Sequence, residues 1–113
     1  MSKASRLLAA PPFAVERTLK TLGENLRTAR LRRRLTLDEV AQKVGVSRRI
    51  ISDAEKGKPS TGIGIYAAAL WALGLLDQLA TVADPTKDTE GHALALSREK
   101  ARARKTQVLD NDF

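Results

Sequence analysis

Apolar residues between positions 36 and 57 recur at the spacing of α-helices. In the first part of this stretch they fall at i, i+3, i+4 and i+7, and so share one side of a helix: Leu37, Val40, Ala41 and Val44. In the second part, Ile50, Ile51 and Ala54 share one face, and polar residues occupy the other. The pattern predicts two short amphipathic helices that follow one another closely.

Residues with capping preferences mark the ends of both helices. Thr36, with Glu39 three residues later, has the pattern of a capping box, which predicts a helix start. Gly45 can adopt the left-handed conformation that ends a helix, and Ser47 can cap the next one. The turn between them is about three residues long, as in helix-turn-helix pairs that bind DNA.

The outward face of the second predicted helix is polar and begins with two arginines. This face comprises Arg48, Arg49, Ser52, Asp53 and Lys56. Arginine side chains donate to phosphates and to the edges of bases in the major groove. The composition of this face therefore favours a helix that contacts nucleic acid.

A longer helix is predicted upstream of this pair. Apolar positions from Val15 to Ala29 fit one helix that begins after Pro12 and ends in the basic run 30–34. Cations suit the C-terminus of a helix because of its dipole, which accounts for part of that run. We expect Arg33 or Arg34 to reach a phosphate.

The apolar pattern downstream predicts two more helices, so the expected fold is all-α. Residues 63–73 are apolar on nearly all sides, as in a helix at the centre of a core. Core packing is the expected role of its large side chains, Tyr66 and Trp71. A fifth helix is expected over residues 75–83.

Composition and breaker residues divide the chain into three parts. Residues 1–12 show no sustained period and are expected to form a flexible arm, and residues 13–84 form the helical domain. Pro85 marks the boundary to a flexible basic tail, residues 85–113, which is partly helical or disordered. Residues 89–105 can form a helix, but an isolated helix of this length is marginal in water, so it packs on a partner or frays.

The charge of the chain is strongly positive and unevenly placed. The net charge is +7 and the pI is near 10.3. The length of 113 residues leaves room for one small domain with tails. Residues 1–34 carry +7, residues 35–84 carry −1, residues 85–105 carry +3 and the last eight carry −2. Basic ends indicate a polyanion as partner, and solubility is the alternative explanation.

The sequence contains few residues that could support catalysis, metal binding or a membrane span. There is no cysteine, and the one histidine, His92, has no carboxylate cluster beside it. Asp53 and Glu55 are two positions apart and lie on different helix faces. Residues 7–10 are too short for a signal peptide, and the uncharged stretch 59–76 suits a buried helix better than a membrane span. We expect a cytoplasmic, nucleoid-associated protein that is not an enzyme and has no cofactor.

The central residues carry a family resemblance. Residues 41–47, Ile51 and residues 55–57 resemble the Xre, or λ-repressor-like, helix-turn-helix family, and the similarity extends to residues 22–30. The resemblance implies a five-helix DNA-binding domain. It also implies an ion pair between Arg30 of the first helix and the glutamate that ends the recognition helix, Glu55.

Carried over position by position, the resemblance implies a set of DNA contacts. Bases are read by Arg48, Arg49 and Asp53, with Ser47 and Ser52 close enough to assist, and the backbone is held by Lys56 and Lys58. Asp53 departs from the amide or basic residue common there, and it either accepts from cytosine N4 or orients Arg49. Leu37 stands where many relatives have a polar phosphate contact, for which Thr36 can substitute.

A narrower resemblance concerns the flanks. Residues 11–12, 58–61 and 109–113 resemble those of HipB-type antitoxins. That resemblance implies autorepression and neutralisation of a HipA-like kinase toxin. Because one short domain contacts only about half of a typical operator, we also expect a homodimer on a palindromic operator of double-stranded DNA. Leu109 and Phe113 are the candidate docking residues, with a solvated chain end as the alternative.

Alternatives remain open for the function and for the dimer contact. The first alternative is a free-standing Xre-type repressor without a toxin. The second is an adaptor that has lost DNA binding, and the arginine pair makes this adaptor the less favoured alternative. In λ-repressor-like domains the fifth helix and the loop before it often form the dimer contact. Leu75, Leu76 and Leu79 are the candidates here, and local core packing is the competing explanation.

Overall fold

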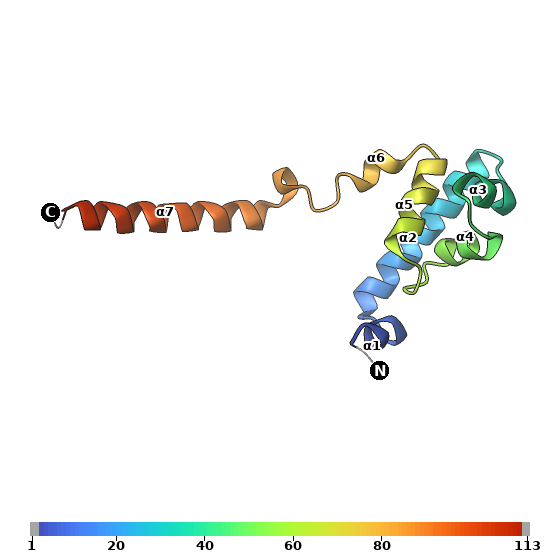
Figure 1. The fold of residues 1–113 in the computed structure, drawn as a ribbon, viewed down its shortest axis with the longest axis horizontal. Helices are drawn as coiled ribbons and strands as arrows, with labels where there is room; N and C mark the ends of the chain where they lie inside the picture. The colour runs from blue at the N-terminus through green and yellow to red at the C-terminus, as the bar shows by residue number, and fades with distance from the viewer. Residues whose placement is uncertain (1–2, 112–113) are drawn as a thin grey trace. The chain divides into compact units, whose positions relative to one another are not determined.

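The computed structural model describes residues 3–111, and the side chains of residues 6–109. Every regular element in that part is helical, which confirms the all-α prediction (Figure 1). The elements are α1 (Lys3–Ala9), α2 (Phe13–Arg32), α3 (Leu37–Val44), α4 (Arg48–Glu55), α5 (Ile63–Ala72), α6 (Leu76–Leu79), the 3₁₀-helix η1 (Pro85–Lys87) and α7 (Thr89–Asn111). They form two compact units that divide between Leu79 and Ala80.

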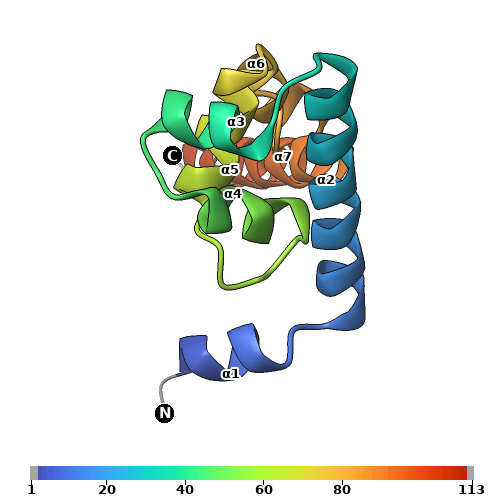
Figure 2. The ribbon, with the colours of Figure 1, turned by 90° about the vertical axis from the view of Figure 1, so that its right-hand side faces the viewer.

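The first unit is built around α4, which packs against α2, α3 and α5 (Figure 2). Two adjoining groups of buried side chains form its core. One comprises Leu26, Ala54, Tyr66, Ala69, Leu70 and Leu73, and the other comprises Val40, Ala41, Ile51 and Ala72. Because α4 supplies Ala54 to the first group and Ile51 to the second, its orientation is fixed from both sides.

Two glycines allow α2 and the end of α4 to approach closely. A β-carbon at Gly23 would lie 2.5 Å from the carbonyl oxygen of Glu55 and 2.8 Å from that of Ala54. Gly57, with φ of +67°, leaves no room for a side chain beside the backbone of Leu19. Glycine at both positions therefore sets the distance between α2 and α4.

The N-terminal arm and the fifth helix differ from the predictions. Residues 1–12 show no sustained period and are expected to form a flexible arm, yet the structure has the helix α1 there, whose sequence has neither glycine nor proline and includes good helix formers. The helix expected over 75–83 is confined to Leu76–Leu79. Thr81 and Val82 are β-branched, and Ala83 has a φ of +58°, so the chain leaves the helical conformation before Pro85.

The burial of two apolar side chains was also predicted wrongly. Trp71 is 51% exposed, and Ile50 is 36% exposed although it was assigned to the inward face of its helix. In contrast, Tyr66 is buried, as expected, and its hydroxyl donates to the carbonyl oxygen of Lys58 at 3.2 Å. Of the two large residues on α5, only Tyr66 belongs to the core.

The second unit comprises η1 and α7, joined by capping interactions. Asp84 Oδ1 accepts from the backbone amide of Thr86 at 2.9 Å and from its hydroxyl at 2.8 Å, and these bonds lower the pKa of Asp84. Asp88 Oδ1 accepts from the amide of Gly91 at 3.0 Å, near the start of α7. The two compact units divide after residue 79, five residues before the predicted domain boundary at residue 84. The boundary at residue 84 remains a prediction.

Candidate nucleic-acid interface

The turn between α3 and α4 is fixed by local capping. Thr36 Oγ1 accepts from the amide of Glu39 at 3.0 Å, and the Glu39 carboxylate accepts from the amide of Thr36 at 3.2 Å. Gly45 ends α3 in the left-handed conformation with φ of 88°, and Ser47 caps α4 by accepting from the amide of Ile50 at 3.4 Å. These observations confirm the predicted capping box, turn and second cap.

The two faces of α4 have opposite character. Ile51 and Ala54 are almost completely buried, whereas Arg48 and Arg49 are exposed at the first turn. The nearest acidic group to Arg48 is Asp38, with 3.9 Å between Nη1 and Oδ2 and both side chains well exposed. A pair of this kind contributes little, so it leaves the guanidinium available to other acceptors.

A buried ion pair connects α2 with the end of α4. Arg30 Nε lies 2.7 Å from Glu55 Oε2, and Nη2 lies 3.0 Å from Oε1, while Nη1 donates to the carbonyl oxygen of Leu35 at 2.8 Å. The hydrogen bond to Glu55 raises the pKa of Arg30 above its ordinary value. The structure thus contains the ion pair that the family resemblance implies, and one guanidinium links α2, the α2–α3 loop and α4.

Asp53 has a partner that sequence reasoning did not identify. Its carboxylate lies 2.9 Å from the Lys58 ammonium, and this hydrogen bond is the largest cause of a lowered pKa of Asp53, with a smaller contribution from Arg49. Asp53 is half-buried on the outward side of α4. In this structure, therefore, Asp53 pairs with the lysine that follows the helix.

Lysines from two parts of the chain, α2 and the end of α4, line one open hollow of about 410 Å³. Lys56 and Lys58, expected at the DNA backbone, lie there beside Lys20 of α2, and the acidic Glu16 also lines the hollow. Sequence reasoning missed Lys20 because it is far from the other two along the chain. A weak signal was its spacing from Glu16, with which it forms an i, i+4 pair at 3.2 Å.

The remaining candidate residues of the first unit are exposed or half-buried. Thr36 is exposed, but its hydroxyl already serves the capping box. Ser47 is exposed and Ser52 is half-buried, both on α4 or its cap. Arg33 and Arg34 are exposed after α2, and Arg33 Nη1 donates to the carbonyl oxygen of Ala29 at 2.9 Å.

The candidates for partner contacts fall into two groups. Leu75 and Leu79 pack against the core of the first unit, so local packing accounts for them, whereas Leu76 is 40% exposed. Leu109 is exposed on α7, and Phe113 lies outside the described residues.

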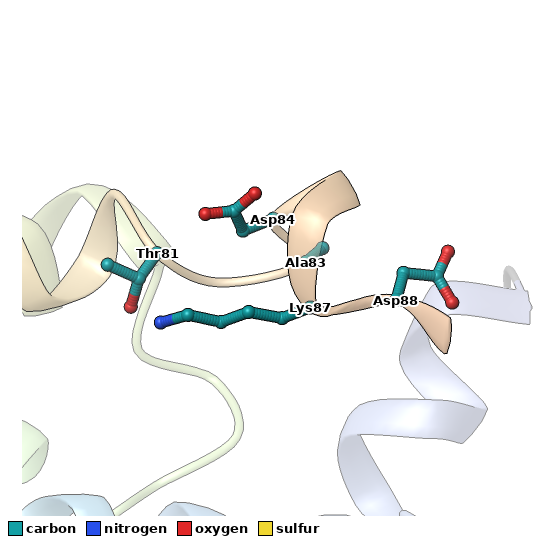
Figure 3. Close-up of a pocket in the computed structure, with 5 residues that line it drawn as sticks. All are labelled: Thr81, Ala83, Asp84, Lys87 and Asp88. Carbon is teal, nitrogen blue, oxygen red and sulfur yellow. The ribbon is translucent and has the colours of Figure 1, made fainter. Parts of the chain in front are cut away.

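The described residues offer little for other kinds of chemistry. An open hollow of about 350 Å³ lies in the second unit. Figure 3 shows Lys87 extending towards Thr81 there, and the other lining residues are Ala83, Asp84 and Asp88. Both carboxylates there serve as caps. Among residues 6–109, whose side chains the structure describes, no cluster of three or more His, Asp or Glu side chains could hold a metal ion. No helix in the same range has the length and apolarity needed to cross a bilayer.

Comparison with known proteins agrees with this geometry. No curated protein matches the chain. A family model described as a helix-turn-helix domain matches residues 21–82, which is more than half of the 113 residues and includes α3, the turn, α4 and α5. The chain therefore belongs to the helix-turn-helix family of DNA-binding regulators.

Proposed function

We propose that this protein is a sequence-specific transcriptional repressor that reads its operator with the outward face of α4. The observation that carries the proposal is the pair of exposed arginines, Arg48 and Arg49, on the first turn of a helix that is anchored in the core by the buried Ile51 and Ala54. A helix held in this way presents its first turn as a rigid group of donors. That is the arrangement by which recognition helices contact bases in the major groove.

The chemistry of recognition follows from the donors on this face. A guanidinium can donate two hydrogen bonds to O6 and N7 of guanine, which discriminates against the wrong base by ~1–3 kcal/mol. Ser47 and Ser52 can assist at the same edge. Asp53 can accept from cytosine N4 only after its hydrogen bond with Lys58 is released, so reading by Asp53 would be coupled to a movement of that lysine.

The lysines at the end of α4 supply backbone contacts. Lys20, Lys56 and Lys58 line one hollow together with Glu16, and they would hold a phosphate without reading the sequence once Lys20 and Lys58 leave their ion pairs with Glu16 and Asp53. Thr36 and the exposed Arg33 and Arg34 provide further donors near the start of α3. These contacts would give the affinity a strong dependence on salt, with a slope of about 0.9 per phosphate neutralised.

A homodimer on a palindromic operator completes the proposal. One small domain covers about half of a typical operator, and two recognition helices ~34 Å apart read successive turns of the same DNA face. Exposed apolar residues are available for the dimer contact on α5 and α6, namely Ile63, Trp71 and Leu76. They support a contact centred on α5, whereas Leu75 and Leu79 are already used by the core.

The double substitution Arg48→Ala/Arg49→Ala tests the base-reading assignment. A preferred duplex is first selected from a random pool with the parent protein, and gel shifts then compare the preferred duplex with a scrambled one. In this variant we expect the ratio of the affinities for the preferred and the scrambled duplex to fall to about one. The reason is that removing two bidentate contacts takes away on the order of 2–6 kcal/mol of discrimination between bases.

The matched control is Arg17→Ala/Arg27→Ala, which removes the same charge from exposed positions on α2. It should lower affinity through charge alone and keep the preference. If Arg48→Ala/Arg49→Ala keeps the parent's preference for the selected duplex, α4 is not the reading element.

We further propose that the repressor is an antitoxin that holds a HipA-like kinase toxin inactive. The support is the resemblance of residues 58–61 and 109–113 to HipB-type antitoxins, together with the exposure of Leu109. Purification of the tagged protein from its native cell should recover a kinase at equal stoichiometry, and deletion of residues 106–113 should release it. Recovery of DNA-binding activity with no such companion favours the free-standing repressor instead.

A further inference from the structure

The most basic stretch of the second unit lies in the middle of α7. Between residues 98 and 105 there are five basic residues and one acidic residue, Glu99. All of these side chains are exposed, and within the described residues none of the five cations takes part in an ion pair. Neither capping nor internal pairing accounts for this concentration of charge.

The five cations divide between two opposite sides of the helix. Arg98, Arg102 and Lys105 fall at i, i+4 and i+7 and so share one side, which we call the Arg98 face. Lys100 and Arg104, also four residues apart, share the other side. Like charges at this spacing repel, which destabilises a free helix by ~0.2–0.5 kcal/mol per pair.

No buried apolar face within the second unit offsets this repulsion. From Glu90 to Leu109, every side chain with a β-carbon is exposed, so no apolar face is buried. An isolated helix is marginal in water even with favourable residues. A polyanion along the Arg98 face would neutralise the repulsion and stabilise the helix at the same time.

We propose that the Arg98 face of α7 is a second DNA-binding surface, which contacts phosphates beside the operator without reading its sequence. The proposal rests on the proposed function, because it assumes that the same DNA is bound by α4. The chemistry suits a regular array of phosphates. Residues 98–105 extend over ~12 Å of helix axis, along which duplex DNA presents roughly seven phosphate charges.

The distribution of apolar residues favours DNA over a membrane surface. Helices that lie on membranes gather their apolar residues on one side and their cations on the other. In α7 the exposed Leu94, Val108 and Leu109 lie on or beside the same side as the Arg98 face, and Leu96 lies on the opposite side, so apolar residues and cations are not separated. A duplex requires only the cations.

The experiment compares two double substitutions in the full-length chain. Arg98→Gln/Arg102→Gln removes two charges from the Arg98 face, and Lys100→Gln/Arg104→Gln removes two charges at the same spacing from the opposite side. Binding to the selected and the scrambled duplex is measured by fluorescence anisotropy over a series of salt concentrations. Binding to vesicles of phosphatidylserine and phosphatidylcholine is measured in parallel.

We expect Arg98→Gln/Arg102→Gln to weaken binding to both duplexes by the same factor, on the order of tenfold, and to lower the salt slope by about 1.8. The preference for the selected duplex should be unchanged, and Lys100→Gln/Arg104→Gln should have a clearly smaller effect. Addition of either duplex should raise the helical circular dichroism signal of the parent more than that of Arg98→Gln/Arg102→Gln.

Three results would overturn the proposal. They are equal losses in both variants, no loss in either, or tighter binding of the parent to the vesicles than to the duplexes. Failure of the proposed function gives a different result: the parent then shows no preference for any duplex, while the difference between the two variants on scrambled DNA remains.

Discussion

At the scale of single residues, Arg30 contributes most to the position of α4, the helix of the candidate nucleic-acid interface. It is the one charged residue among the buried residues of the described chain, and the Glu55 carboxylate and the Leu35 carbonyl accept hydrogen bonds from it. A lysine could not serve these acceptors, because its ammonium is a single point at the end of a flexible chain. The position of α4 relative to α2 therefore depends on a planar, forked donor.

The substitution Arg30→Met tests this dependence. It leaves the Glu55 carboxylate buried without a counter-charge, so the free energy of unfolding in urea should fall by about 3 kcal/mol. Adding Glu55→Met to the same chain should restore most of that loss, because the uncompensated charge is then removed. In the exposed pair of Glu16 and Lys20, the control Lys20→Met should change stability by less than about 1 kcal/mol.

Tyr66 gives the first unit a dependence on alkaline pH. Burial raises the pKa of its hydroxyl above the ordinary value of 10.0, and the neutral hydroxyl donates to the Lys58 carbonyl. Because the unfolded chain loses this proton at lower pH than the folded one, the contribution is fully present below pH 10.0 and is lost as pH rises through the folded pKa. The slope cannot exceed about 1.4 kcal/mol per pH unit.

Tyr66→Phe should therefore lose less stability than the parent between about pH 9 and pH 11. Urea unfolding at several pH values measures the difference, and subtracting the two curves removes the contribution of the lysines that titrate in the same range. Parallel curves for the two proteins would show that Tyr66 ionises as readily in the folded state as in the unfolded one.

At the scale of elements, the close approach of α2 and α4 is set by Gly23. Gly23→Ala would place a methyl group against the backbone of α4, which cannot move without disturbing Ala54, so stability should fall by about 2–3 kcal/mol. Gly64→Ala is the matched control, since a β-carbon there meets no atom within 4 Å and the residue lies in α5. It should be neutral or slightly stabilising. Thermal and urea unfolding measure both variants.

The parts of these elements that the sequence predicted are those with local causes. The capping box at Thr36, the left-handed Gly45 and the Ser47 cap involve groups within a few residues of each other, so their types and spacing were sufficient. The burial of α5 was not predictable in the same way. Its residues are apolar on nearly all sides, and the pattern could not distinguish the buried side, with Tyr66, from the exposed side, with Trp71.

The residues that surround the polar face of α4 are brought there by contacts between distant parts of the chain. Lys20 and Lys58 line one hollow because α2 and the segment after α4 meet at Gly23 and Gly57, a contact that periodicity cannot indicate. Asp53 and Lys58 are only five residues apart, but the turn that brings them together follows the helix at Gly57, and helical periodicity does not describe that turn. The face of α4 was predictable, and its surroundings were not.

At the scale of the whole molecule, the two units differ in how they are stabilised. The first unit has a buried core in which α2, α3, α4 and α5 all take part. In the second unit, the described side chains of α7 with a β-carbon are all exposed. Cooperative unfolding therefore belongs to the first unit, and the helicity of α7 depends on conditions.

Ala101→Pro tests this independence. Proline in a helix interior costs ~3 kcal/mol or more and should abolish the helix around residue 101. The thermal midpoint of the first unit, followed by tryptophan fluorescence, should stay the same. Ala69→Pro, at a buried position of α5, is the control and should unfold the first unit. A fall in the midpoint for Ala101→Pro would show that α7 stabilises the first unit.

The exposure of Trp71 has a practical consequence. It is the single tryptophan of the chain, and its ring lies on the surface of α5 with the Lys43 ammonium 5.3 Å from its centre. All indole emission therefore arises from one known position that is in contact with water. Any molecule that covers this side of α5 displaces that water and shifts the emission to shorter wavelength. The natural protein thus carries an intrinsic optical reporter of its own assembly, and needs no attached dye.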